Sequence, residues 1–227
     1  MGLSTTDLGI EGGSGLPKTI SPGNYTLKIN SLVLEDFKFI DGAKHLIINV
    51  ETEPIEGFEG FMIDKDNPDA GHYAGQIGRV KASQYAFADG ETKNGTKVYR
   101  DKSLMIFMKN LTTTLGISDW FLAQDNKHDS IEEFIDAFNE TAPFKSKYLD
   151  FCIAGKEYEG KNGYTNYDMW LPKGSKDAYS IAPKGGKVMT FDETEHLKKL
   201  EVKQVDSFGD DDDLTIPPRA SSDFSLD

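Results

Sequence analysis

The alternation of apolar and polar residues predicts β-strands in the first quarter of the chain. In residues 24–29, Tyr, Leu and Ile alternate with Asn, Thr and Lys, which is the period of a strand with one buried face. Residues 32–34 continue this pattern beyond a bulge expected at Asn30-Ser31. Asp41-Gly42 is a hairpin turn signal, and residues 46–50 supply the returning strand.

A third strand is expected from the β-prone residues Phe58, Phe61 and Ile63. Residues 64–75 follow as a polar loop rich in Pro and Gly. The aspartates of this loop lack the spacing and the closing Glu of an EF-hand, so we interpret it as a solvated loop.

Two helices are predicted in the middle of the chain. Apolar residues recur at helical spacing over residues 104–115, and Gly116 is typical of the position that follows a helix. Ser130 followed by Glu133 forms a capping box in front of a second apolar stripe, and Pro143 stops that helix.

The last predicted elements are strands at residues 148–154 and 164–171, with a turn within residues 156–163. The order is therefore strands, two helices and a final hairpin. It predicts a mainly β protein with two helices, either a small barrel or an α+β domain, rather than a βαβ fold.

The chain divides by composition into a folded body and polar ends. We expect a flexible leader at residues 1–21, a domain at 22–180 with an insertion at about 64–102, a linker with a possible short helix at 181–205, and an acidic disordered tail at 206–227.

The charge is unevenly distributed along the chain. The net charge of −13 by itself argues against a nucleic-acid partner. However, residues 30–69 carry −7 and residues 110–143 carry −6, whereas residues 79–109 carry +4 and residues 145–187 carry +3. A polyanion would therefore be bound locally, by the two basic stretches.

No motif indicates catalysis, and we expect the protein not to be an enzyme. The sequence contains neither a P-loop nor a Gly-x-Ser-x-Gly elbow, and its four histidines lack metal-ligand spacing. The single cysteine, Cys152, rules out an internal disulfide and a cysteine-based zinc cluster. We expect no cofactor, no metal and no membrane partner. Without a visible signal peptide, a cytoplasmic location is favoured.

Cations and aromatic residues are interleaved in the two basic stretches. Single-stranded nucleic acid is bound by this combination, because cations contact phosphates and aromatic faces stack on bases, at roughly 1–3 kcal/mol per base. For any single aromatic residue, burial in a strand is an equally good explanation. The candidate nucleic-acid-binding residues are Arg79, Lys81, Tyr85, Phe87, Lys97, Tyr99, Arg100 and Lys102 in the first stretch and Lys156, Tyr158, Lys161, Tyr164, Tyr167, Trp170 and Lys173 in the second.

The C-terminal tail, residues 206–227, contains seven aspartates and one arginine. Charge repulsion and two prolines oppose folding of such a segment. It is either a solubilising tail or an interaction peptide, in which acidic residues steer a partner and an aromatic residue docks. The candidate partner-binding residues are Asp210, Asp211, Asp212, Asp213 and Phe224.

The pattern and order of these elements resemble a family of phage proteins with OB-like barrels. The resemblance starts at Gly23-Asn24-Tyr25-Thr26-Leu27-Lys28-Ile29, passes through Leu115-Gly116-Ile117 and Tyr148-Leu149-Asp150-Phe151, and ends at Met169-Trp170-Leu171-Pro172. It implies a five-stranded OB-like barrel that binds single-stranded DNA in phage replication or recombination, in the cytoplasm of the host cell. The acidic tail resembles those of single-stranded DNA-binding proteins, which recruit replication partners and compete with DNA, although here Ser225-Leu226-Asp227 follow Phe224.

The expected function is therefore coating of single-stranded DNA. Replication or recombination proteins are the expected partners of the tail. The sequence is also compatible with a homo-oligomer. Two other classes are compatible with the sequence. One is a phage structural or assembly protein, which would form a stable symmetric oligomer without DNA affinity. The other is an acidic adaptor that binds a basic protein.

The tail hypothesis predicts the effect of a truncation. If the tail competes with DNA for the basic stretches, removal of residues 206–227 tightens binding to oligo-dT, most strongly at low salt, because surface charges are screened as salt rises. Titration of the full-length and truncated chains at two salt concentrations measures this. Unchanged or weaker binding would leave the tail as a tether or a solubilising segment.

Overall fold

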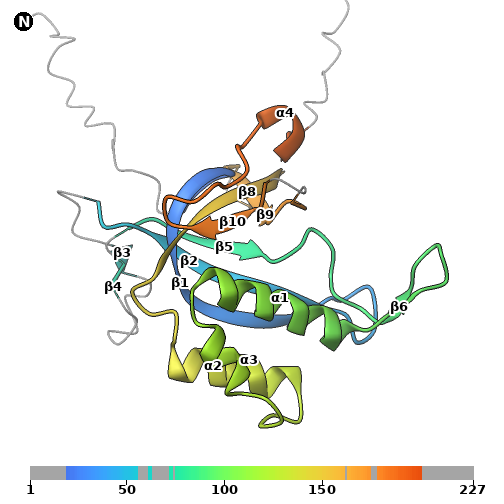
Figure 1. Cartoon of the computed structure of the whole chain (residues 1–227). Coiled ribbons are helices and arrows are strands. Elements are labelled where there is room, and N and C mark those ends of the chain that lie inside the picture. The colour runs from blue at the N-terminus through green and yellow to red at the C-terminus, as the bar shows by residue number, and fades with distance from the viewer. Residues whose placement is uncertain are drawn as a thin grey trace, which may run out of the picture.

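Strands dominate the structure (Figure 1). A computed structural model describes residues 19–55, 61–62, 72–73, 75–161, 163–174 and 178–200. Within these residues the strands are β1 (Gly23–Asp36), β2 (Lys44–Thr52), β3 (Phe61–Met62), β4 (His72–Tyr73), β5 (Ile77–Lys81), β6 (Gly90–Glu91), β7 (Lys97–Val98), β8 (Tyr148–Glu159), β9 (Thr165–Trp170), β10 (Ile181–Pro183) and β11 (Leu197–Lys198). The helices are α1 (Arg100–Thr114), α2 (Ser118–Leu122), α3 (Ile131–Thr141) and α4 (Glu193–His196).

Five strands form a closed ring of pairings. The order runs β1-β2-β5-β9-β8, and β8 pairs with β1 again. All neighbours are antiparallel except β5 and β9, which are parallel. The chain passes through α1, α2 and α3 between β5 and β8. β10 and β11 add to β8 outside this ring.

The long strand β1 belongs to both halves of the ring. Residues Gly23 to Lys28 pair with β8, and Leu27 to Asp36 pair with β2, with a register shift between Ile29 and Ser31. The predicted bulge at this place is confirmed. A bulge bends a strand and increases its twist, which is what β1 needs to leave β8 and follow β2.

Beyond the bulge, the free edge of β1 is capped by a side chain from α3. The amide of Asn139 accepts a hydrogen bond from the Leu32 N–H at 2.8 Å and donates one to the Leu32 carbonyl at 2.7 Å. Leu32 is buried, so these two backbone groups need partners within the protein. Asn139 thus substitutes for the neighbouring strand.

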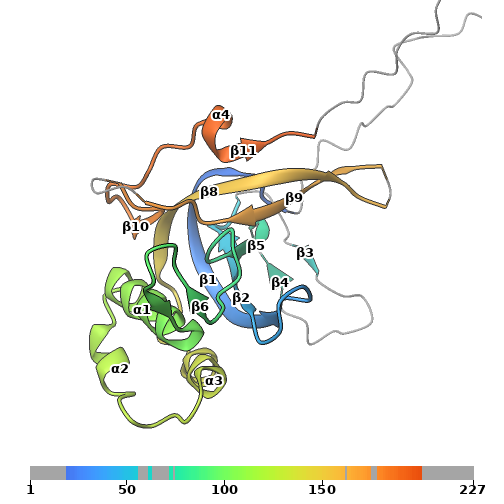
Figure 2. The same cartoon turned by 90° about the vertical axis from the view of Figure 1, so that its right-hand side faces the viewer.

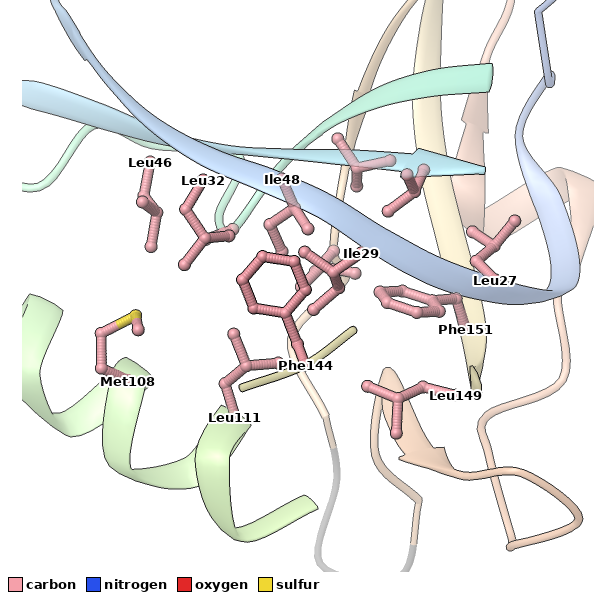
Figure 3. Close-up of a cluster of buried hydrophobic side chains, with 14 of the residues drawn as sticks. Leu27, Ile29, Leu32, Leu46, Ile48, Met108, Leu111, Phe144, Leu149 and Phe151 are labelled. Atoms are coloured by element: carbon pink, nitrogen blue, oxygen red, sulfur yellow. The ribbon is translucent and has the colours of Figure 1, made fainter. Parts of the chain in front are cut away.

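The core fills the space between the ring and the helices. Figure 3 shows Leu27 and Leu149 from the strands, together with Met108 and Leu111 from α1, directed into one cluster. The side chains of Leu27, Leu46, Ile48, Val80, Leu104, Met108, Phe138, Phe151 and Ile153 are fully buried in it. Helices α1, α2 and α3 lie together on one side of the strands in Figure 2, whereas α4 lies apart from them beside β11.

The helix ends follow the signals in the sequence. After α1, Gly116 takes a φ of 67°, and the N–H groups of Gly116 and Ile117 donate to the carbonyls of Thr113 and Thr112, closing the helix in a Schellman motif. At the start of α3, the Ser130 hydroxyl accepts from the Glu133 N–H at 3.2 Å. Both predicted helices are confirmed. α2 is an addition, and α4 lies where a short helix was expected.

Three predicted boundaries change. The segment 64–102 is not an insertion throughout, because it contains β5, which pairs with β2 and β9. Segment 181–205 is not only a linker, since β10 and β11 pair with β8. The leader ends before Ile20, which is buried and donates its N–H to the Ile77 carbonyl at 2.9 Å.

Other predictions lie wholly or partly outside the described residues. These are the leader up to residue 18, the tail at 206–227, the loop from 64 to 71, and Phe58 and Ile63 of the third strand. The described part of the predicted third strand is β3, which pairs with β4.

The contact between Asn139 and Leu32 predicts a specific loss of stability. Asn139→Ala leaves two backbone groups without partners and lowers the free energy of unfolding by about 2 kcal/mol. The neighbouring exposed Glu140→Ala is the control and changes it by less than about 0.5 kcal/mol. Urea denaturation followed by circular dichroism compares the two, and equal values would contradict the capping role.

Candidate nucleic-acid interface

An open groove of about 1020 Å³ runs over the outer face of the ring. It is lined by residues of β1, β2, β5, β8 and β9 and by residues 19–21. Four of the predicted binding residues line it: Arg79, Lys81, Tyr158 and Tyr167. The groove therefore joins the two basic stretches, which are far apart in the sequence.

Strand alternation on β5 turns the two cations outward. Gly78 and Val80 are buried, and Arg79 and Lys81 alternate with them. At Gly78, a Cβ atom would lie 2.5 Å from the side chain of Ile20, so glycine is needed where Ile20 packs against the strand.

Both groove cations are paired with carboxylates of other strands of the ring. Arg79 forms an ion pair with Glu35 of β1, and Lys81 lies 2.8 Å from Asp168 of β9. The four side chains carry no net charge together. Phosphates would thus have to compete with Glu35 and Asp168, so the groove itself is less basic than the sequence suggests.

His45 lies beside this charged cluster without adding to it. Burial lowers its pKa, and the nearby Lys81 lowers it further. In the described part of the chain its Nδ1 atom has no hydrogen-bond partner, and the His45 ring packs edge-on against Phe37 at 5.1 Å. His45 is therefore neutral at pH 7.

One end of the groove is formed by an arm, the part of the β8–β9 hairpin from Lys156 to Asp168. It extends beyond the ring in Figure 2. Tyr158 and Tyr164 are exposed on it, Tyr164 to 75%. Lys156 and Lys161 are exposed, and neither forms an ion pair within the described residues. The arm offers free aromatic faces next to unpaired cations.

The turn between β1 and β2 and the start of α1 lie outside the lining of the groove and contact each other. The Arg100 guanidinium donates to the Gly42 carbonyl at 2.9 Å and pairs with Asp101 at 2.6 Å. Tyr85 and Tyr99 are exposed here, as are Lys97 and Lys102. These residues of the first stretch gather near the turn rather than in the groove.

Some predicted stacking residues belong to the body instead. Trp170 is only 7% exposed, and Lys198 Nζ lies over its ring at 5.6 Å from the centroid. Phe87 and Tyr167 pack against the core, although Tyr167 also borders the groove. The stacking role predicted for Trp170 and Phe87 does not agree with these positions. Lys173 is exposed after β9 but does not line the groove.

Sequence reasoning missed the aromatic residue that is most exposed among those whose side chains the structure describes. Phe39 is 86% exposed in the β1–β2 turn, and Ile40 beside it is half exposed. The available signal was an apolar pair directly before Asp41-Gly42, where a turn needs no core residue. Phe39 contacts Phe37 edge-on at 5.4 Å, so it has a supporting partner.

Within the described residues, no group of three or more His, Cys, Asp or Glu side chains is arranged to hold a metal ion. No helix among them is long and apolar enough to cross a bilayer. Comparison with protein-family models, curated proteins and solved structures finds no match for this chain.

If the groove binds single-stranded DNA, the ion pairs predict that Glu35 and Asp168 oppose that binding. Glu35→Gln and Asp168→Asn each release a cation, so affinity for oligo-dT increases several-fold at low salt. The slope of log K against log salt becomes steeper by about 0.7 per released contact. Glu53→Gln is the control, because it removes the same charge from a pair with Lys184 outside the groove. Equal effects in all three variants would contradict a local role.

Proposed function

We propose that the chain is an OB-like five-stranded barrel that binds single-stranded DNA without catalysing a reaction. The ring supports this proposal: in chain order its strands are β1, β2, β5, β8 and β9, with the third and fifth parallel and the first and fourth paired. Proteins with OB folds bind oligonucleotides on the face of the second and third strands, between the first and last hairpin loops.

The observation that carries the proposal is the position of the groove. It lies over β2 and β5, which correspond to the second and third strands. The flanking loops are the β1–β2 turn with Phe39 and the arm with Tyr158 and Tyr164. Exposed aromatic residues therefore stand at both sides of the face where an OB-like protein would bind a strand.

In this mechanism, the bases stack on aromatic faces while cations contact phosphates, without sequence preference. Lys156 and Lys161 are unpaired within the described residues and would make the first phosphate contacts. Arg79 and Lys81 would exchange Glu35 and Asp168 for phosphates as the strand enters the groove. The proposed setting is phage replication or recombination, where the tail residues Asp210 to Asp213 and Phe224 would recruit partner proteins.

The net negative charge of the chain favours one alternative function, that of an acidic adaptor that binds a basic protein. Without its tail the chain still carries −7, and its groove cations are paired, which suits an adaptor that binds a basic protein. Such an adaptor would not bind DNA even at low salt, and neutralising carboxylates in residues 30–69 would weaken its binding to the basic partner. A structural protein would instead form a stable symmetric oligomer.

The proposal predicts the effect of removing the arm's aromatic faces. Tyr158→Ala and Tyr164→Ala each weaken binding to dye-labelled oligo-dT by about 1–3 kcal/mol, measured by fluorescence anisotropy. Tyr179→Ala is the control, since Tyr179 is exposed outside the groove and the arm. Trp170→Phe also leaves affinity unchanged, because that ring is covered. No binding by the wild type at low salt, or equal losses in all four variants, would contradict the proposal.

A further inference from the structure

A second pocket lies in the helical layer, away from the groove. It has a volume of about 380 Å³ and is formed by α1, α2, α3 and the α2–α3 loop. None of its lining residues lines the groove. In Figure 2, α1, α2 and α3 lie on the other side of the strands from the arm. A ligand here would not obstruct the nucleic-acid interface proposed above.

The lining of this pocket combines an apolar floor with acidic groups. Its apolar side chains are Met105, Phe121, Leu122, Ile131 and Phe134, and its charged side chains are Asp101, Asp125 and Asp129. None of the described lining residues is Lys or Arg. Leu122 is 67% exposed, which leaves an apolar contact surface in water next to carboxylates.

The carboxylates differ in how far they are neutralised. Asp101 pairs with Arg100 at 2.6 Å, and Asp125 accepts a hydrogen bond from the Asn126 side chain at 3.0 Å. The Asp129 carboxylate makes no ion pair or hydrogen bond with the described residues. Residues 110–143, which contribute most of the lining, together carry −6.

The pocket is already shaped before any partner binds. Gln124 donates to the Trp120 carbonyl at 3.3 Å and is hydrogen-bonded to the His128 ring at 3.1 Å, and that ring packs against Phe134. These contacts hold the α2–α3 loop around the pocket. A preformed site loses less entropy on binding, which favours a specific contact.

We propose that this pocket docks a cationic segment of a partner protein, with a large apolar side chain as its anchor. The anchor would pack on Leu122 and Phe121, while lysines or arginines face Asp125 and Asp129. The chain's own tail, at −6, has the wrong charge to fill the pocket. The proposal does not rest on DNA binding.

The test uses the full chain and a short random peptide library displayed on phage. Selection at low salt should enrich peptides with net positive charge and at least one large apolar residue. The double variant Asp125→Lys/Asp129→Lys should weaken the selected peptides roughly tenfold or more in fluorescence anisotropy, about 1.4 kcal/mol. Leu122→Asn, which removes the apolar contact without adding charge, should weaken them as well, and its exposed position leaves folding intact, as thermal unfolding would verify.

The matched control is Asp136→Lys/Glu140→Lys, which makes the same charge change on exposed positions of α3 outside the pocket. Because the acidic tail is present in every variant, its attraction for cations cancels in the comparison. Neutral or acidic selected peptides, or equal weakening by the control variant, would overturn the proposal. It would also be overturned if the pocket variants abolished self-association measured by sedimentation, since the occupant would then be a second copy of this chain.

Discussion

The structure depends on one strand that has two different neighbours. β1 hydrogen-bonds with β8 along its first half and with β2 along its second half, and the bulge at Ile29–Ser31 lets it turn from one to the other. Without this change of partner the five strands would form an open sheet with two free edges. Ring closure removes those edges, which would otherwise be available for pairing with another chain.

The helices complete what β1 leaves unpaired. Where β1 separates from β8, its backbone would face the interior without partners, and Asn139 of α3 supplies both a donor and an acceptor. The same helix presents Phe134 and Phe138 to the core, and α1 adds Met108 and Leu111. The helical layer is therefore tied to the strands by polar contacts as well as by apolar packing, and its position is defined by both.

Local signals predicted much of this fold, while non-local pairing was hidden. The alternation in β1, its bulge and the caps of α1 and α3 are properties of short segments, and they were predicted correctly. β5 was missed because Ile77-Gly78-Arg79-Val80-Lys81 contains a glycine and two cations, and its role depends on β9, which lies far along the chain. In the site, the partners of Arg79 and Lys81 are 44 and 87 residues away, so no pattern around these cations shows that they are paired.

The uneven distribution of charge along the chain has a consequence for encounters in solution. Residues 110–143 carry −6, whereas residues 79–109 and 145–187 carry +4 and +3. A molecule of this kind has an electric dipole in addition to its net negative charge. In the field of a charged polymer it is rotated before contact, so its orientation on arrival is biased although its overall charge is repelled. The arrangement acts on the rate and geometry of association, and both effects fade as salt shortens the range of the field.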